Sequence, residues 1–342
     1  MIDKLIGQFK KYKFRVAVKN ILYHIQTIER RKSYGPENPD KIIYIIRPID
    51  DKSPFYIGPV HNLLANYFYV LSHLQYARVK GWVPVVDQLN YPVYNSQSSP
   101  INGTKNAWEY FWEQPGGVTL DEAYRSNNVV LSKRSWFWEW DIGYDAARYK
   151  DKNTVAFYSE LAAMAKLNEE TRDHIAKAAD DLLPKGKKVL GVNVRIGGHS
   201  AHSAKHGEGH PIQPELEELI SDVKLLAQSL KADCIFVSSD TEYAVDRFKA
   251  YFGDNLIVYP RLRAAIGTEF APDSQKNIYG QGKSYQTALD YLTEMELLSR
   301  CDALIGSVNS GFRYAVVRNA NRFEQIEVID SGRFDDGRIK KI

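Results

Sequence analysis

Short apolar runs alternate with longer segments of mixed polarity along most of the chain. The first apolar run covers residues 41–48; a loop over 50–59, a segment with apolar residues at helical spacing from Leu64 to Leu74, and a second apolar run at 82–87 follow it. Apolar runs of this kind are typical of strands buried on both faces of a parallel sheet. The order strand, loop, helix, strand predicts a βαβ unit in this part of the chain.

The alternation becomes regular from residue 188 onward. Such regularity predicts a second Rossmann-like domain, in which loops at the carboxyl ends of the strands carry the ligand site. We predict strands at 188–194, 234–237, 256–259, 303–305 and 327–330, with helices at 214–230, 242–252, 284–299 and 312–318. A further strand is predicted at 129–131, and one or two helices at 155–183 link the two halves.

The N-terminal stretch has a different character. Residues 1–32 contain nine Lys or Arg and two acids, with apolar residues at helical spacing from Phe14 to Ile28. This pattern fits a basic amphipathic helix on an anionic membrane surface, and it fits somewhat better a helix packed on the protein's own core with its charges solvated. Residues 33–40 read as a linker. The sequence thus divides into a basic helix and linker (1–40), an N-terminal Rossmann-like domain (41–183) and a C-terminal one (184–342).

Composition narrows the class of protein. The 342 residues are 44% hydrophobic and 25% charged, with a formal net charge of +3, which gives no indication of nucleic-acid binding. The two cysteines, Cys234 and Cys301, stand inside apolar runs and read as small buried residues in a reducing compartment. No apolar run approaches the roughly 18 residues of a membrane span, and charges interrupt every candidate signal peptide. We therefore expect a cytoplasmic protein, with the inner membrane face as a location that the basic helix would favour.

Residues 88–128 are irregular and rich in aromatic side chains such as Trp108 and Trp112, and Trp136, Trp138 and Trp140 follow after the strand predicted at 129–131. Aromatic rings in polar loops stack on sugar rings in some proteins and form satellite cores under long loops in others. Of these two interpretations, which both stay open, the sequence slightly favours satellite cores.

The candidate functional residues lie in the loops that follow three strands of the second domain. The first loop offers Arg195, whose rigid guanidinium suits a diphosphate, and Glu208, a candidate base. The second offers Asp240, and the third offers small polar residues before a helix N-terminus, an arrangement that binds phosphate. The third-loop residues are Ser307, Asn309 and Ser310.

Four histidines, His199, His202, His206 and His210, share the first loop. The spacing of His202 and His206 suits a metal on a helix, but the surrounding glycines and serines argue against a helix. We expect no metal site and a loop that faces the substrate. Because no P-loop, GxSxG or GxGxxG motif occurs, a nucleophilic hydrolase and a nicotinamide enzyme are unsupported.

These motifs together resemble the fucosyltransferase superfamily, and most closely the α1,6-fucosyltransferases of the nodulation and N-glycan-core type. The resemblance rests on Val-x-Val-Arg ending at Arg195, the Gly/His loop up to His210-Pro211, Phe-Val-Ser-Ser-Asp ending at Asp240, and the stretch from Glu294 to Arg313. It covers residues 188–318 well. It extends faintly to 41–87, where Ile-Gly-Pro-x-x-Asn ends at Asn62. The resemblance implies a GT-B fold, with two Rossmann-like domains facing across a cleft, and metal-independent, inverting transfer of L-fucose from GDP-fucose without a further cofactor.

Position by position, the resemblance implies roles for six residues. Arg195 matches the arginine that holds the donor diphosphate, Glu208 the proposed base, and Asp240 the acid after the second strand. Glu294 falls where the family has an aspartate that recognises guanine, and Ser310 and Arg313 match the phosphate-binding serine and the arginine after it.

The chain also departs from the family pattern. Where the family has His-x-Arg-Arg, this chain has Asn193, Arg195 and Ile196, so that one positive charge beside the diphosphate is missing. These changes leave two alternatives beside a fucosyltransferase: a GT-B transferase with a different sugar nucleotide, and a non-catalytic glycan- or nucleotide-binding protein. The expected acceptor is a sugar hydroxyl of a bacterial surface glycan or of its lipid-linked precursor.

Overall fold

The computed structural model describes residues 28–48, 63–93, 95–196, 211–264 and 285–335, together with the backbone of 338–340. The chain divides into two compact units, which we describe separately. Unit 1 comprises Met1–Ser96, Asn106–Trp108 and Gln114–Asp141, and unit 2 comprises Gln97–Lys105, Glu109–Glu113 and Ile142–Ile342. The segment 142–183, which the sequence places in the first domain, thus groups with unit 2. No helix in the described ranges combines the length and apolarity needed to cross a membrane.

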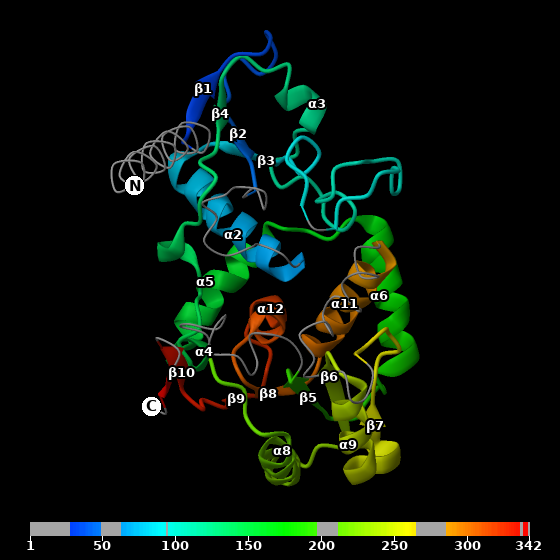
Figure 1. Cartoon of the computed structure of the whole chain (residues 1–342). Helices are drawn as coiled ribbons and strands as arrows, with labels where there is room; N and C mark the ends of the chain where they lie inside the picture. Colours follow the sequence, from blue (N-terminus) through cyan, green and yellow to red (C-terminus); the bar gives the residue numbers. More distant parts are fainter. Residues whose placement is uncertain are drawn as a thin grey trace, which may run out of the picture. The chain divides into compact units, whose positions relative to one another are not determined.

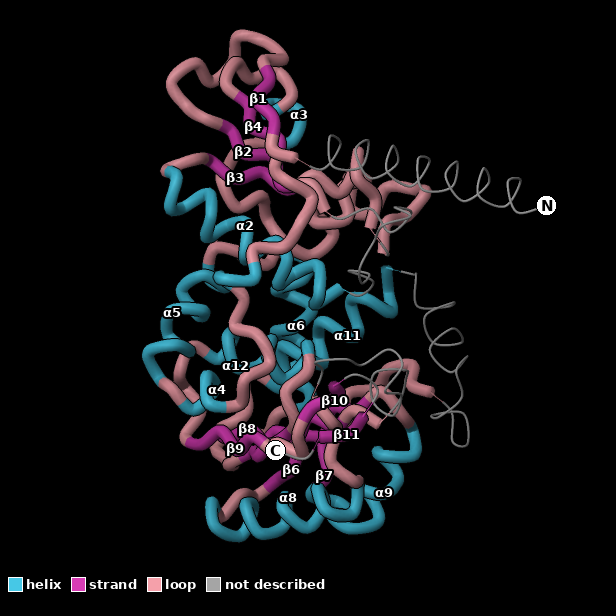
Figure 2. Tube along the Cα trace, turned by 60° about the vertical axis from the view of Figure 1, so that its left-hand side comes forward, coloured by secondary structure: helices cyan, strands magenta, loops and turns pink. Residues whose placement is uncertain are grey.

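Unit 1 is built on a four-stranded sheet in the order β1-β4-β2-β3 (Figures 1 and 2). Strand β2 (Ile43–Ile46) is central and runs parallel to its two neighbours, β3 (Val83–Val86) and β4 (Val129–Leu131), as the βαβ pattern predicts. Helix α2 (Leu63–Lys80) makes the crossover between β2 and β3, and the single turn α3 (Leu120–Ala123) precedes β4. One core of this unit joins the strands to α3; it contains Ile43, Ile45, Val85, Leu120 and Val129.

Strand β1 (Arg30–Lys32) was not expected, because the sequence assigns these residues to the basic helix. It pairs antiparallel with β4, with Arg30 opposite Leu131. The strand satisfies the backbone groups along the edge of β4, and this tertiary pairing prevails over the helical spacing of the apolar residues before it. The helix predicted over residues 1–27 lies outside the described residues.

Unit 2 contains a five-stranded sheet in the order β7-β6-β5-β8-β9, and all neighbouring strands are parallel. The order of strands and main helices predicted after residue 188 is confirmed, although β7 is two residues shorter than predicted and β9 lies two residues earlier. The strands are β5 (Val189–Val194), β6 (Cys234–Ser239), β7 (Leu256–Ile257), β8 (Ala303–Gly306) and β9 (Gln325–Val328). The helices are α4 (Ala147–Lys150), α5 (Lys152–Ala163), α6 (Glu169–Leu182), α8 (Leu216–Leu230), α9 (Glu242–Phe252), α11 (Tyr285–Leu298) and α12 (Ser310–Asn319). A 3-10 turn (Gly253–Asn255) follows α9, and a short hairpin of β10 (Arg333–Asp335) and β11 (Arg338–Lys340) follows β9.

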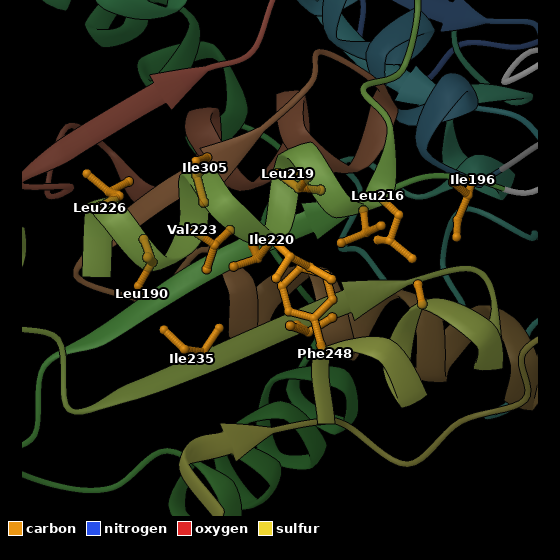
Figure 3. Close-up of a cluster of buried hydrophobic side chains, with 14 of the residues drawn as sticks. Leu190, Ile196, Leu216, Leu219, Ile220, Val223, Leu226, Ile235, Phe248 and Ile305 are labelled. Carbon is orange, nitrogen blue, oxygen red and sulfur yellow. The ribbon is translucent and has the colours of Figure 1, made fainter. Parts of the chain in front are cut away.

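Different helices cover the two faces of this sheet. Leu190, Val192 and Val194 of β5 point to the face that α8 and α9 cover, where they form an apolar core with Ile220 and Phe248 (Figures 1 and 3). Because side chains alternate along a strand, Gly191 and Asn193 point to the opposite face, toward α11 and α12. Both cysteines are buried and free, which confirms that they act as small core residues.

The aromatic segment divides into buried and exposed parts. Trp108, Tyr110, Phe111 and Trp112 are at most 2% exposed, so these rings form satellite cores. Trp138, in the 3-10 turn η1 (Trp138–Trp140), is 69% exposed, so its ring lies on the surface.

Candidate functional site

The strand order of unit 2 identifies the edge of its sheet at which a ligand can bind. The chain places β5, β6 and β7 successively toward one edge and then returns to add β8 and β9 on the other side of β5. The winding direction therefore reverses between β5 and β8. In open α/β sheets, ligands bind outside the carboxyl ends of the strands at such a switch point.

Asn193 and Asn309 meet at this switch point. Asn193 is the fifth residue of β5, and its Oδ1 accepts a hydrogen bond of 2.6 Å from Nδ2 of Asn309, which follows β8. Gly306 makes the approach possible, because a Cβ there would lie 2.7 Å from the carbonyl oxygen of Asn193. Two residues of the sequence-predicted site are thus brought together, and a glycine of the same motif is required for their contact.

Asn309 also caps α12. Its Oδ1 accepts from the backbone N–H groups of Gly311 (2.9 Å) and Phe312 (3.1 Å). Two of the amides that the sequence offered to a phosphate are therefore already satisfied by the cap. An anion at this helix would be bound mainly by the first-turn residue Ser310, which is half-buried, and by the side chains around it.

Ser307 precedes this cap and is 1% exposed. Its Oγ has no hydrogen-bond partner in the described part of the chain. A buried hydroxyl in this condition carries a desolvation cost that a bound acceptor group would relieve.

The ends of β5 and β6 are tied by Asp240. Its Oδ1 accepts a hydrogen bond of 3.3 Å from the backbone N–H of Ile196. Arg195, directly before Ile196, and Asp240 are both half-buried, so each has part of its surface at the carboxyl edge of the sheet. Arg195 thus stands between the switch point and Asp240.

Arg313 lies deeper than its neighbours in the last motif. It is 3% exposed, and its guanidinium carbon is 4.9 Å from the centre of the Tyr144 ring. The ring face stabilises the buried cation. Arg313 therefore contributes positive charge behind the N-terminus of α12.

Glu294 is fully buried on α11 and is engaged on both carboxylate oxygens. Oε2 accepts from Arg261 Nε (2.8 Å) and from Ser238 Oγ (2.9 Å), and Oε1 accepts from Arg263 Nη2 (2.6 Å). Both arginines in turn donate to the carbonyl oxygen of Ser239, at the end of β6. In this arrangement, Glu294 holds two guanidinium groups against the strand end next to Asp240.

The environment of Arg261 favours its charged form. Burial is the largest influence and acts to lower the pKa of Arg261, but the charge and hydrogen bond of Glu294, with a further contribution from Asp240, raise it overall. The carboxyl edge of the sheet therefore carries four guanidinium groups and two carboxylates among the residues described so far. The cations are Arg195, Arg261, Arg263 and Arg313, and the carboxylates are Asp240 and Glu294.

Sequence reasoning missed Arg261 and Arg263. A signal was present, because Arg261 and Arg263 alternate with Leu262 a few residues after the short strand β7, and an extended chain places such residues on one side. Strand β7 has only two residues, so its end was hard to locate.

Several predicted site residues lie outside the described residues: Glu208, the four loop histidines and Asn62. Among the residues that are described, no group of three or more His, Cys, Asp or Glu side chains is arranged to hold a metal ion. A cavity of about 260 Å³ lies near the start of β9, lined by residues such as Tyr149, Phe323 and Glu327, and it contains none of the predicted site residues.

No protein-family model matches the chain, and no curated protein matches it. The structure is similar to solved fucosyltransferases. It aligns with the NodZ α-1,6-fucosyltransferase soaked with GDP-fucose at 14% identity and a TM-score of 0.44, over 81% of this chain and 92% of that one. With NodZ from Bradyrhizobium the identity is 15% and the TM-score 0.44, over 89% and 99% of the two chains. With POFUT1 in complex with GDP the identity is 10% and the TM-score 0.46, over 85% and 99%.

Proposed function

We propose that the chain is a glycosyltransferase that binds a nucleoside-diphosphate sugar, GDP-fucose, at the switch point of the unit 2 sheet. The observation that carries the proposal is the meeting of three separate motifs at one sheet edge. Asn309 bonds to Asn193, Asp240 bonds to the amide after Arg195, and Gly306 permits the close packing. The excess of guanidinium groups over carboxylates at this edge suits a diphosphate, because guanidinium pairs with phosphate oxygens in a fixed geometry.

The proposed reaction is an inverting transfer without metal. The acceptor hydroxyl oxygen forms a bond to C1 of the sugar from the face opposite the diphosphate, while the bond from C1 to the diphosphate oxygen breaks. The hydroxyl proton passes to the carboxylate of Glu208, a role that rests on the sequence motif. Arg195 stabilises the negative charge that develops on the departing GDP.

Calorimetric binding of GDP, UDP, ADP and CMP, without metal and then with magnesium, tests the donor. We expect selective binding of GDP that is unchanged by magnesium. Preference for another nucleotide would replace the donor but keep the site, and binding of none of the four would contradict the proposal.

Two variants separate an enzyme from a binding protein. Arg195→Ala removes a charge at the leaving group, so we expect it to weaken GDP binding and to abolish fucose transfer. Glu208→Gln keeps the shape of the side chain but cannot accept the proton, so we expect GDP binding to persist while transfer falls at least about 100-fold. Binding of GDP by the parent protein without any transfer to glycan acceptors would favour the non-catalytic alternative.

A further inference from the structure

Trp138 has the largest exposed fraction, 69%, among the large hydrophobic side chains of the described residues. Its ring stacks on Trp136, with centroids 4.8 Å apart and ring planes inclined by 8°. Trp136 in turn packs edge-on against Tyr69 of α2 at 5.6 Å. The stack on Trp136, which itself packs on Tyr69, therefore holds the indole of Trp138 in its exposed position.

The aromatic contacts continue along one face of α2. Tyr69, His73, Tyr76 and Lys80 follow one another at steps of four, three and four residues, so they line one side of the helix. The segment 133–140 packs along this line. Phe137 stacks on Tyr76 with centroids 4.6 Å apart, and Trp140 lies 5.8 Å from the same ring.

Val79 and Ile28 are two further exposed apolar side chains, and each lies close in sequence to Tyr76 or to a residue that contacts it. Val79, one turn after Tyr76, is 62% exposed. Ile28 is 39% exposed, and the next residue, Glu29, hydrogen-bonds to Tyr76. We call Ile28, Val79 and Trp138, together with the neighbouring cations Arg78, Lys80 and Lys133, the Trp138 patch.

The segments that form this patch carry mostly positive charge. The segments 28–32, 76–80 and 133–140 contain seven Lys or Arg residues and two acids, Glu29 and Glu139. Lys80 Nζ lies 5.5 Å from the Tyr76 ring centre, and Lys133 Nζ lies 3.4 Å from that of Phe137. Cations and exposed apolar groups thus occupy the same part of unit 1.

We propose that the Trp138 patch binds the surface of an anionic phospholipid bilayer. Tryptophan is favoured at the membrane–water interface because its ring is apolar but carries an N–H donor, and each nearby Lys or Arg adds attraction to anionic headgroups. The two acids of these segments, Glu29 and Glu139, are outnumbered by seven cations, and this excess of positive charge favours an anionic surface over a neutral sugar as the occupant. This inference does not depend on the proposed transferase activity.

Vesicle flotation of the full chain tests the proposal. We expect binding to phosphatidylcholine vesicles that contain phosphatidylglycerol, and much weaker binding to phosphatidylcholine alone or at high salt. Trp138→Ala should weaken partitioning about 3- to 10-fold, and reversing both Arg78 and Lys80 to Glu should weaken it on the order of 10-fold. Leu225→Ala is the matched control, because Leu225 is 67% exposed but lies on α8 of unit 2.

Tryptophan emission provides a readout that is specific to this side chain. Lipids brominated in the acyl chain should quench the emission on binding, and Trp138→Phe should remove most of this quenching while the fold is kept. The measurement also separates the patch from residues 1–27, which contain no tryptophan. Unchanged quenching in Trp138→Phe, or equal partitioning of Trp138→Ala and the Leu225 control, would overturn the proposal. Weaker binding of oligosaccharides with unchanged vesicle binding would also overturn it, in favour of a sugar platform.

Discussion

His73 is a fully buried histidine whose two ring nitrogens are both engaged. Nδ1 lies 2.8 Å from Tyr44 Oη, and Nε2 lies 3.2 Å from the carbonyl oxygen of Ser135. Since a carbonyl can only accept, Nε2 carries the proton and Nδ1 accepts from the tyrosine hydroxyl. Burial lowers the pKa of His73 to about 3, so the folded protein holds this ring neutral.

This neutral ring makes unit 1 sensitive to acid. Below about pH 6.5 the unfolded chain protonates His73 while the folded chain does not, so the unfolded state binds more protons. The contribution of His73 to stability is therefore complete above pH 6.5 and is lost progressively as the pH falls toward about 3. We expect a loss of roughly 1 kcal/mol for each pH unit in this range, measured by urea unfolding at pH 7 and pH 5.

Two variants isolate the cause of this dependence. His73→Gln cannot be protonated and should flatten the dependence, although it is less stable at pH 7. Tyr44→Phe removes the hydrogen bond but keeps the burial that chiefly lowers the pKa, so it should keep the slope. A parent-like slope in His73→Gln would contradict the account.

Glu294 is the residue on which two buried arginines depend. Glu294→Gln keeps the size of the side chain but leaves the charges of Arg261 and Arg263 without their counter-ion in a buried position. Breaking a buried pair in this way costs about 3 kcal/mol, and we expect a loss of that order in the free energy of unfolding. Lys177→Ala, which breaks the exposed pair with Asp181, should produce no measurable change. Equal effects of the two variants would show that Glu294 is not structurally required.

At the scale of elements, the junction of β5, β8 and α12 depends on two glycines. A Cβ at Gly306 would lie 2.7 Å from the backbone oxygen of Asn193, whereas a Cβ at Gly311 would meet side-chain atoms only, Met295 Sδ at 2.8 Å and Asn193 Nδ2 at 3.0 Å. Gly306→Ala must therefore move the backbone. We expect it to cost about 1–3 kcal/mol and to weaken GDP binding, both measured on the purified variant.

Gly311→Ala provides the comparison within the same loop. Met295 can change rotamer, and alanine favours the helix that begins at Ser310, so the loss of stability should be clearly smaller. If Gly311→Ala were the more damaging change, the close approach of β8 to Asn193 would not explain the glycine motif.

The sequence predicted an element well where the residues of that element alone determine its structure, and poorly where the structure depends on contacts with distant residues. The strands β5 and β6 are buried along all six residues, and their apolar residues identified them, although the prediction ended β6 at 237, before the polar Ser238 and Ser239. Strand β1 has three residues, none of them fully buried, and it exists only through its pairing with β4, which no local pattern records. The same reason explains the site: the motif residues were visible, whereas the contact between Asn193 and Asn309 spans 116 positions and required the fold.

At the scale of the whole molecule, the tryptophans report almost entirely on unit 1. Five of the six, all except Trp112, belong to the segments of unit 1, whereas the proposed nucleotide site lies in unit 2. Tryptophan emission therefore follows the unfolding of unit 1, and far-UV circular dichroism follows both units. The distribution of tryptophans offers a way to locate nucleotide binding without a structure of the complex.

A nucleotide that binds only the folded site stabilises the part of the protein that contains the site, by about 2.7 kcal/mol at 100 times its dissociation constant. If GDP occupies the switch point between β5 and β8, we expect it to raise the unfolding midpoint seen by circular dichroism at least as much as that seen by tryptophan emission. Arg195→Ala should remove the shift, while Trp138→Ala should leave it intact, because that residue belongs to unit 1. A shift confined to the tryptophan signal would place nucleotide binding in unit 1 and contradict the assignment of the donor site to unit 2.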